Sequence, residues 1–260
     1  MTAVLEHLLV EDALPAVLVT LNRPEQRNAL STPLMRELTE ELERQSARPE
    51  VRAIVLRANG PAFSAGHDLR ELVDRTLKDE QLVFDVCTRM METIQRIPQP
   101  VIAAVRGIAT AAGCQLVATC DLAIAAEEAR FATPGVRIGL FCSTPMVAVS
   151  RSIGRKRALE MLLTGRPIDA HTAAGWGLVN RVVPAAQLEA EVKTLAQKIA
   201  SGPPLAVRAV KRVMFAEQKS ALERALEAEV GHQMKCFASE DCLEGVQAFF
   251  EKRAPRFRGR

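Results

Sequence analysis

Two glycine-containing turns carry residue types that could stabilise a developing negative charge. The first covers residues 63–69 (FSAGHDL) and the second covers residues 107–116 (GIATAAGCQL). Small side chains let another group approach the backbone closely, and the first N–H groups of a helix have no partner within that helix. Together the turns could offer two N–H donors to one oxygen, which is what an oxyanion hole requires. The same spacing also fits tight turns in a packed α/β protein, so the pattern alone leaves both interpretations open.

The elements around these turns predict an α/β fold. We expect strands at 51–57, 101–105 and 122–126, and two strands within 8–21 around a turn at 12–15. Ser31 is a suitable N-cap for a helix through 47, because leucines recur every four residues after it. Helical patterns return at 79–97 and near 111. Helices dominate beyond 145, which gives an α/β core followed by a helical C-terminal region.

Composition excludes several classes of protein. The chain has 260 residues, 48% of them hydrophobic and 25% charged, and its net charge of +3 does not indicate a nucleic-acid partner. No apolar run is long enough for a membrane helix, so we expect a cytoplasmic protein without a membrane partner. The six cysteines form no C-x-x-C pair and indicate reduced thiols, with no metal site. No phosphate-binding glycine loop follows the first strand, which argues against nucleotide chemistry.

A set of ordered motifs resembles the enoyl-CoA hydratase/isomerase (crotonase) superfamily. The set extends over nearly the whole chain, and the order of the motifs is more specific than any one of them. The matching segments are LNRP at 21–24, RNAL at 27–30, FSAGHDL at 63–69, AAGC at 111–114, CDL at 120–122, FATP at 131–134, LTG at 163–165, AGWGLV at 174–179 and EG…FFEKR at 244–253.

The resemblance implies a spiral of β-β-α units. It implies an acyl-CoA-binding core at 1–195 and a helical region at 196–260 for assembly and pocket closure. It also implies homotrimers, or hexamers built as two trimers. No cofactor is expected to be tightly bound, because coenzyme A arrives as part of the substrate. The implied label is a lyase of the enoyl-CoA hydratase type that acts on thioesters derived from fatty acids or amino acids.

Site residues follow from the same resemblance. The backbone N–H groups of His67 and Ala112 would form the oxyanion hole. Coenzyme A would lie along 27–29 and 65–70, and side chains near the C-terminus could approach its adenine or a phosphate. The implied coenzyme A contacts are Arg27, Ala29, Ala65, Asp68, Leu69, Arg70, Phe249 and Lys252.

The chain departs from the hydratase pattern at two positions. Hydratases of this family use two glutamates on opposite sides of a water, and here Gln115 and Gly135 stand in their places. An amide cannot exchange a proton as a carboxylate does, and each missing acid or base typically costs about 10²–10⁴ in rate. We therefore expect hydration to be weak or absent. No acid occurs between 139 and 145, so isomerisation is also poorly supported. We expect Gln115 and Gly135 to face the acyl end of the thioester.

Two alternatives remain for the chemistry. The first is decarboxylation of a malonyl-type thioester, in which His67 would meet the carboxylate, although decarboxylating members have a tyrosine near the position of Phe141. The second is a thioester-binding protein without catalysis. The alternative for the His67 side chain, which the sequence alone favours, is a surface histidine. Cys142 is expected to be a buried, inert thiol, while Ser143 and Thr144 precede a proline and are expected to cap a helix.

Overall fold

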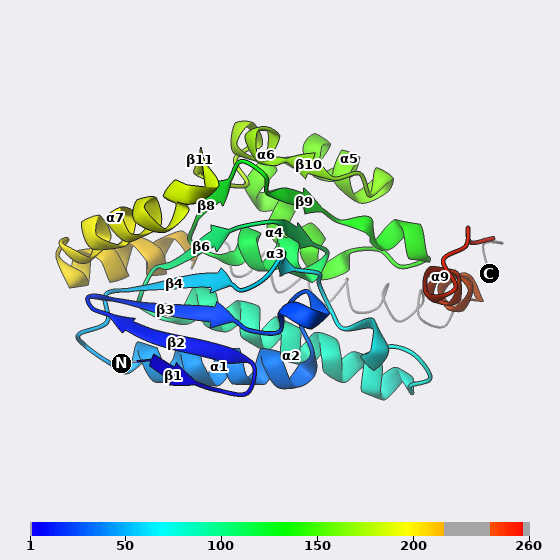
Figure 1. Cartoon of the computed structure of the whole chain (residues 1–260), viewed down its shortest axis with the longest axis horizontal. Helices are drawn as coiled ribbons and strands as arrows, with labels where there is room; N and C mark the ends of the chain where they lie inside the picture. The colour runs from blue at the N-terminus through cyan, green and yellow to red at the C-terminus, as the bar shows by residue number, and fades with distance from the viewer. Residues whose placement is uncertain (1, 216–239, 257–260) are drawn as a thin grey trace.

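The fold is built from two sheets and the helices that enclose them (Figure 1). The structure is a computed structural model of the whole chain, and it describes residues 2–215 and 240–256. Strand order in the larger sheet is β1-β2-β3-β4-β6-β8-β11, and in the smaller sheet it is β10-β9-β7-β5. The strands are β1 (Thr2–Val4), β2 (Leu8–Ala13), β3 (Ala16–Leu21), β4 (Ala53–Ala58), β5 (Ala62–Ser64), β6 (Val101–Val105), β7 (Ile108–Thr110), β8 (Leu122–Ala126), β9 (Arg130–Ala132), β10 (Ile168–Asp169) and β11 (Arg181–Val183).

The helices alternate with these strands. Four short segments are 3₁₀ helices: η1 (Pro24–Gln26), η2 (Leu69–Glu71), η3 (Pro134–Ile138) and η4 (Ala185–Gln187). The α-helices are α1 (Thr32–Ser46), α2 (Leu77–Arg96), α3 (Ala112–Thr119), α4 (Ser143–Ile153), α5 (Arg155–Thr164), α6 (Ala170–Trp176), α7 (Leu188–Ala200) and α9 (Glu240–Phe250).

The chain repeats one unit as it crosses the two sheets. β4, β6 and β8 pair in parallel in the larger sheet, and each is followed directly by β5, β7 or β9 in the smaller one. A helix follows β5 and β7 before the next pair begins. This is the spiral of β-β-α units that the resemblance predicted. The sequence analysis missed β5 and β7 because strands of three residues have almost no periodicity to detect.

Helices cover both faces of the larger sheet. Runs such as VIAAV in β6 are buried throughout, as expected for a parallel strand covered on both sides. On one face, α7 packs through Leu188, Val192 and Ala196 against residues that include Val55 and Ile102. The predicted boundary at residue 195 falls inside α7. The division into a core and a C-terminal region, and the role of the latter in assembly, stay predictions.

Local signals fix where the long helices begin. The Ser31 side chain accepts a hydrogen bond from the N–H of Leu34 at the start of α1, so the predicted N-cap is confirmed. Thr76 and Asp79 form a reciprocal capping box at the start of α2. α2 therefore begins two residues before the predicted start at 79.

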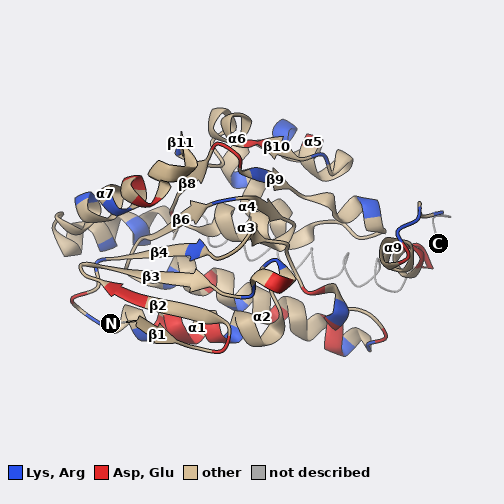
Figure 2. Cartoon of the chain, viewed as in Figure 1, with Lys and Arg blue, Asp and Glu red and all other residues tan. Residues whose placement is uncertain are grey.

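Charged side chains gather on some helices and avoid others (Figure 2). α1 and α2 carry many, whereas α3 carries none and α4 carries one, Arg151. The cysteines in the described residues are buried. Within residues 2–215 and 240–256, every helix is too short or too polar to cross a bilayer.

Candidate active site

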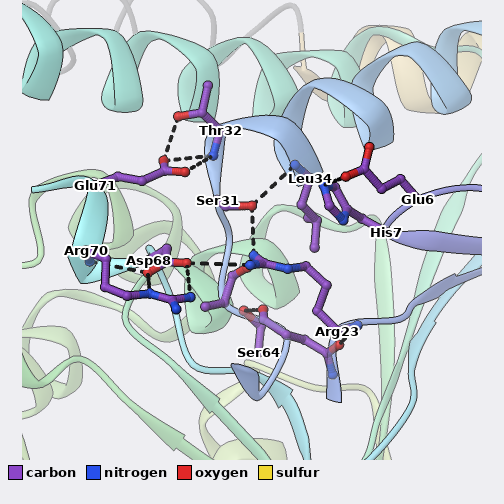
Figure 3. A network of polar contacts seen from close by, with 12 residues as sticks. Glu6, His7, Arg23, Ser31, Thr32, Leu34, Ser64, Asp68, Arg70 and Glu71 are labelled. Carbon is purple, nitrogen blue, oxygen red and sulfur yellow. Dashed lines mark hydrogen bonds and ion pairs between the residues drawn. The ribbon is translucent and has the colours of Figure 1, made fainter. Parts of the chain in front are cut away.

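A network of ion pairs holds the turn after β5 in place (Figure 3). Asp68 caps η2 by accepting a hydrogen bond from the N–H of Arg70. The Arg70 side chain donates two further hydrogen bonds to Asp68, at 2.9 and 2.7 Å, and these hold the pKa of Asp68 below its usual range. Arg23 lies 3.6 Å from the same carboxylate. The turn is therefore anchored from two sides.

The same network ties the turn to the start of α1. Glu71 accepts hydrogen bonds from the N–H and the hydroxyl of Thr32, at 2.9 and 2.7 Å. The Arg23 side chain donates hydrogen bonds to the Ser31 hydroxyl at 2.8 Å and to the Ala29 carbonyl at 3.0 Å. Figure 3 shows these side chains converging from separate elements on one small region. Such a frame limits how far the backbone at residue 67 can move.

The backbone N–H of His67 is left without a partner by its strand pairing. His67 forms a parallel bridge with Leu30, in which the Leu30 N–H donates to the Gly66 carbonyl at 2.7 Å. The Asp68 N–H donates to the Leu30 carbonyl at 3.4 Å. In a parallel pair the flanking residues make the bonds, so the His67 N–H points away from Leu30. It has no hydrogen-bond acceptor in the described part of the chain.

The N-terminus of α3 touches this turn. A Cβ at Gly66 would lie 2.8 Å from the Ala111 Cβ and 3.2 Å from the Ala112 nitrogen, so only glycine allows the approach. Ala111 has a φ of 50°, which is strained for a residue with a side chain. Ala112 is the first helical residue, and its N–H has no partner within the helix. The structure thus brings the two predicted donor segments, at 67 and 112, into contact.

The side chain of His67 lies inside the protein. The residue is half-buried as a whole, but its Nε2 atom is enclosed and has no hydrogen-bond partner. Its ring packs edge-on against Phe84 of α2, with centroids 4.9 Å apart. Burial lowers the pKa of His67 to about 4, so the ring is neutral at pH 7. The interpretation of His67 as a surface histidine is therefore wrong.

Gln115 lines a cavity that lies between three helices and opens to solvent. The cavity lies between α2, α3 and α4 and has a volume of about 50 Å³. Gln115 is 5% exposed, and its Oε1 atom has no hydrogen-bond partner. Thr144 of α4 lines the same cavity, and its hydroxyl is also unpartnered. Both oxygens are shielded, with almost no surface accessible to solvent or to the cavity.

Gly135 has a different environment. It is buried in η3, and its N–H donates to the Cys142 thiol at 3.2 Å. A Cβ at this position would lie 2.9 Å from the backbone nitrogen of Cys142 and 3.0 Å from its sulfur. The loop at 140–142 therefore fills the space that a side chain would need.

The start of α4 differs from its predicted form. Cys142 occupies the N-cap, no side chain caps the helix, and the hydroxyls of Ser143 and Thr144 have no partner. The prediction that these two residues cap the helix is therefore wrong, because both lie inside the first turn. Burial raises the pKa of Cys142 to about 11, which keeps the thiol protonated and unreactive at pH 7.

The two segments predicted to hold coenzyme A lie next to each other. The N–H of Ala65 donates to the Arg27 carbonyl at 3.0 Å. Asn28, which the sequence analysis overlooked, is fully buried between these segments. Its side-chain amide donates hydrogen bonds of 2.8 Å to the carbonyls of Asn59 and Ala62. Arg27 and Asn28 both have a positive φ, 50° and 51°, which asparagine adopts more readily than most residues, but the sequence itself does not show this.

The C-terminal candidates lie on a separate element. Phe249 is 54% exposed near the end of α9, and Lys252 follows this helix. α9 packs against the end of η3, where a Cβ at Gly245 would overlap the carbonyl of Ile138. Their predicted contact with the adenine or a phosphate stays a prediction.

This spiral of β-β-α units, with two unbonded N–H groups where β5 meets α3, defines a crotonase-type fold. The family profile described as enoyl-CoA hydratase/isomerase matches residues 15–260. The chain belongs to this family.

Similar proteins and solved structures agree with the family assignment. The chain is 44% identical, over 238 residues, to enoyl-CoA hydratase domain-containing protein 3, mitochondrial, of Xenopus laevis, covering 91% of this chain and 81% of that protein. An enoyl-CoA hydratase structure from Mycobacterium smegmatis has a TM-score of 0.80 and 47% identity, covering 97% of this chain and 99% of that one. A methylmalonyl-CoA decarboxylase in complex with 2-nitronate-propionyl-CoA has a TM-score of 0.89 and 29% identity, covering 99% and 100%.

Proposed function

We propose that this protein binds an acyl-CoA thioester and stabilises its enolate with the N–H groups of His67 and Ala112. The carrying observation is that the anchored turn with the unbonded N–H of His67 contacts, through Gly66, the helix N-terminus with the unbonded N–H of Ala112. Hydrogen bonds aimed at a developing oxyanion are often the largest single contribution to such catalysis. The positive end of α3 adds to this effect, since no acidic residue lies in its first turn.

Hydration is not the reaction that the side chains support. An amide stands at Gln115, and backbone fills the place of a side chain at Gly135. The buried thiols of Cys142 and Cys114 have a pKa raised by burial to about 11 and about 12, so neither replaces a carboxylate as a base. We propose a reaction that passes through a thioester enolate without a protein carboxylate beside the acyl group.

The test compares an enolate mimic with a ground-state ligand. Calorimetry would measure the affinity of a nitronate-bearing coenzyme A analogue and of propionyl-CoA. We expect the nitronate to bind at least about a hundredfold more tightly. Ala112→Pro removes one donor at the first helical position, where proline is tolerated, and should abolish most of that preference. Equal affinities for the two ligands in the natural protein would contradict the proposal.

Decarboxylation is the second candidate. It is favoured by the likeness to methylmalonyl-CoA decarboxylase and by the neutral, unpaired Nε2 atom of His67. In this reaction the bond to the carboxylate breaks, carbon dioxide leaves, and the electron pair moves onto the thioester carbonyl. A proton from solvent then completes the product, so no protein base is needed. Release of carbon dioxide from malonyl-CoA or methylmalonyl-CoA would distinguish this reaction from crotonyl-CoA hydration.

Assembly and location extend the proposal. We propose a homotrimer, or a hexamer of two trimers, on the resemblance to the family. Exposed apolar residues on α9, such as Leu243 and Phe249, would suit such contacts. A cytoplasmic location stays a prediction, since the name of the Xenopus laevis relative places that protein in mitochondria. Light scattering of the purified protein would determine the number of subunits.

A further inference from the structure

Ser64 lies at the end of the strand that leads into the turn at His67. It is the last residue of β5 and is fully buried. In the smaller sheet it pairs with Ala109 of β7, and β7 is the strand that leads into α3. The strand pair therefore brings Ser64 close to both segments that carry the proposed oxyanion donors.

The hydroxyl of Ser64 makes two hydrogen bonds to the backbone. It donates to the carbonyl of Asn28 at 2.9 Å, and it accepts from the N–H of Gly66 at 3.2 Å. A serine that bonds to the N–H two residues further on closes a small turn. The hydroxyl is used as donor and as acceptor, so this side chain acts on the backbone and not on a ligand.

The hydrogen bonds on either side of this one are between backbone groups. The N–H of Ala65 donates to the Arg27 carbonyl at 3.0 Å. The Gly66 carbonyl accepts from the N–H of Leu30 at 2.7 Å. The N–H and C=O groups of a trans peptide point in opposite directions, so the bond to the Gly66 carbonyl also directs the N–H of His67. Neither of these two bonds depends on a side chain.

The peptide unit between these two is held through its N–H by the Ser64 hydroxyl. Gly66, which provides that N–H, has a φ of 86°. Glycine adopts many backbone conformations, so its own geometry does little to fix the turn. Removing the hydroxyl would leave the N–H of Gly66 without its partner and would loosen the peptide unit that precedes the N–H of His67.

Ser64 also contacts the first turn of α3. A Cβ at Gly113 would overlap the carbonyl of Ser64 and would lie 2.8 Å from its Cβ, so only glycine allows this approach. Gly113 follows Ala112, which provides the second donor. One buried residue therefore touches both donor segments, through a hydrogen bond on one side and close packing on the other.

The third contact of Ser64 is to a residue that is itself firmly held. The N–H of Arg23 donates to the Oδ1 of Asn28 at 2.8 Å, and the Asn28 amide bonds to the carbonyls of Asn59 and Ala62. The Ser64 hydroxyl thus donates to a carbonyl whose position is fixed by several other bonds. This gives the turn at His67 a rigid reference point.

We propose that Ser64 is a positioning residue that orients the N–H of His67 relative to the N–H of Ala112. The inference rests on the proposed function, in which these two groups share one enolate oxygen. Displacing a group by about 1 Å can cost about 10² in rate, so small movements of the turn have measurable effects. The role of Ser64 is to keep the two donors aimed at the same point.

The experiment compares an enolate mimic with a ground-state ligand in the natural protein and in Ser64→Ala. Calorimetry would measure the affinities for a nitronate-bearing coenzyme A analogue and for propionyl-CoA. Alanine is close to serine in size and removes only the hydroxyl. We expect the preference for the nitronate to fall about tenfold, while the affinity for propionyl-CoA stays within about twofold. A purely structural role would weaken both ligands alike.

Two further variants serve as rescue and control. Ser64→Cys keeps a weaker donor and acceptor at the same place, so its preference should fall only about threefold. If Ser64→Ala does not fold, this variant decides. Thr39→Val is the matched control, because Thr39 is buried in α1 and its hydroxyl donates to the Met35 carbonyl, away from the donors. It should leave both affinities unchanged.

An unchanged preference for the nitronate in the Ser64 variants would overturn the inference. So would an equal loss of affinity for both ligands. If the natural protein itself binds the two ligands equally, the proposed function fails as well. That result is distinguishable from failure of the inference alone, in which the natural protein prefers the nitronate and the Ser64 variants keep that preference.

Discussion

The positions of Gln115 and Gly135 show two different outcomes of losing a carboxylate. At Gln115 the side chain keeps its length and still reaches an open cavity. At Gly135 the backbone of Cys142 occupies the space that a side chain would use. At position 115 an amide replaces a carboxylate that could exchange a proton, and the cavity beside the side chain remains. At position 135 the loop of residues 141–142 takes the place of the missing side chain. Restoring a glutamate is therefore a different operation at each position.

The largest expected effect comes from placing a side chain at the filled position. Gly135→Glu should destabilise the protein by about 3 kcal/mol or more, because the loop must move and a carboxylate becomes buried. Urea denaturation measures the change. Gly175→Glu is the matched control, since a Cβ there meets nothing within 4 Å. Similar stabilities for the two variants would mean that the Gly135 position is as open as Gln115.

Lowering the pH tests the buried environment of His67, whose ring packs against Phe84 of α2. The folded pKa of about 4 lies below the ordinary 6.5, so the unfolded chain binds this proton first. The contribution of His67 to stability is complete above pH 6.5 and falls by up to ~3 kcal/mol as the pH drops to 4. Comparing urea denaturation of the natural protein and of His67→Leu across this range isolates the effect. His171→Leu, at an exposed position, is the control, and identical pH dependence in all three proteins would contradict the buried site.

A carboxylate at the open position should be tolerated. Gln115→Glu is expected to cost only about 1 kcal/mol at pH 7, because the cavity beside this residue has room for water to hydrate the carboxylate. Its hydration of crotonyl-CoA should stay at least about 10² below that of an enzyme with both carboxylates, since the second is still missing. Loss of absorbance by the enoyl thioester measures this rate. Ordinary hydratase rates in this variant would show that one carboxylate is sufficient.

The smallest effect concerns the strained residue before the donor helix. Ala111→Gly should raise the free energy of unfolding by up to about 1 kcal/mol, because glycine adopts its φ of 50° without strain. The gain should appear as a higher urea midpoint with an unchanged slope. A clear loss of stability would show that the Ala111 side chain contributes packing that outweighs the strain.

The sequence predicted the frame of the site better than its interior. Long apolar strands and the Ser31 cap predicted the main elements, and the ordered motifs predicted the spiral that joins them. The oxyanion role of His67 and Ala112 came from the same motifs and stays a prediction. Burial of the His67 ring was not predictable, because its partner Phe84 lies on another element. The closure of the loop over Gly135 also depends on a contact, with Cys142, that no local pattern specifies. Local signals identify backbone features, whereas side-chain environments need the tertiary structure.

Lys211 connects the chain that follows α7 to residues at the ends of α2 and α3. Its ammonium group is buried and donates to the carbonyls of Ile94 and Gln99, at 2.7 and 2.9 Å, and it lies 2.7 Å from the Asp121 carboxylate. A fragment that stopped at residue 195 would keep Asp121 and leave it with a buried, uncompensated charge. The chain beyond 195 therefore supplies, through Lys211, the positive charge that balances the buried Asp121. We expect a protein shortened at residue 195 to fold poorly.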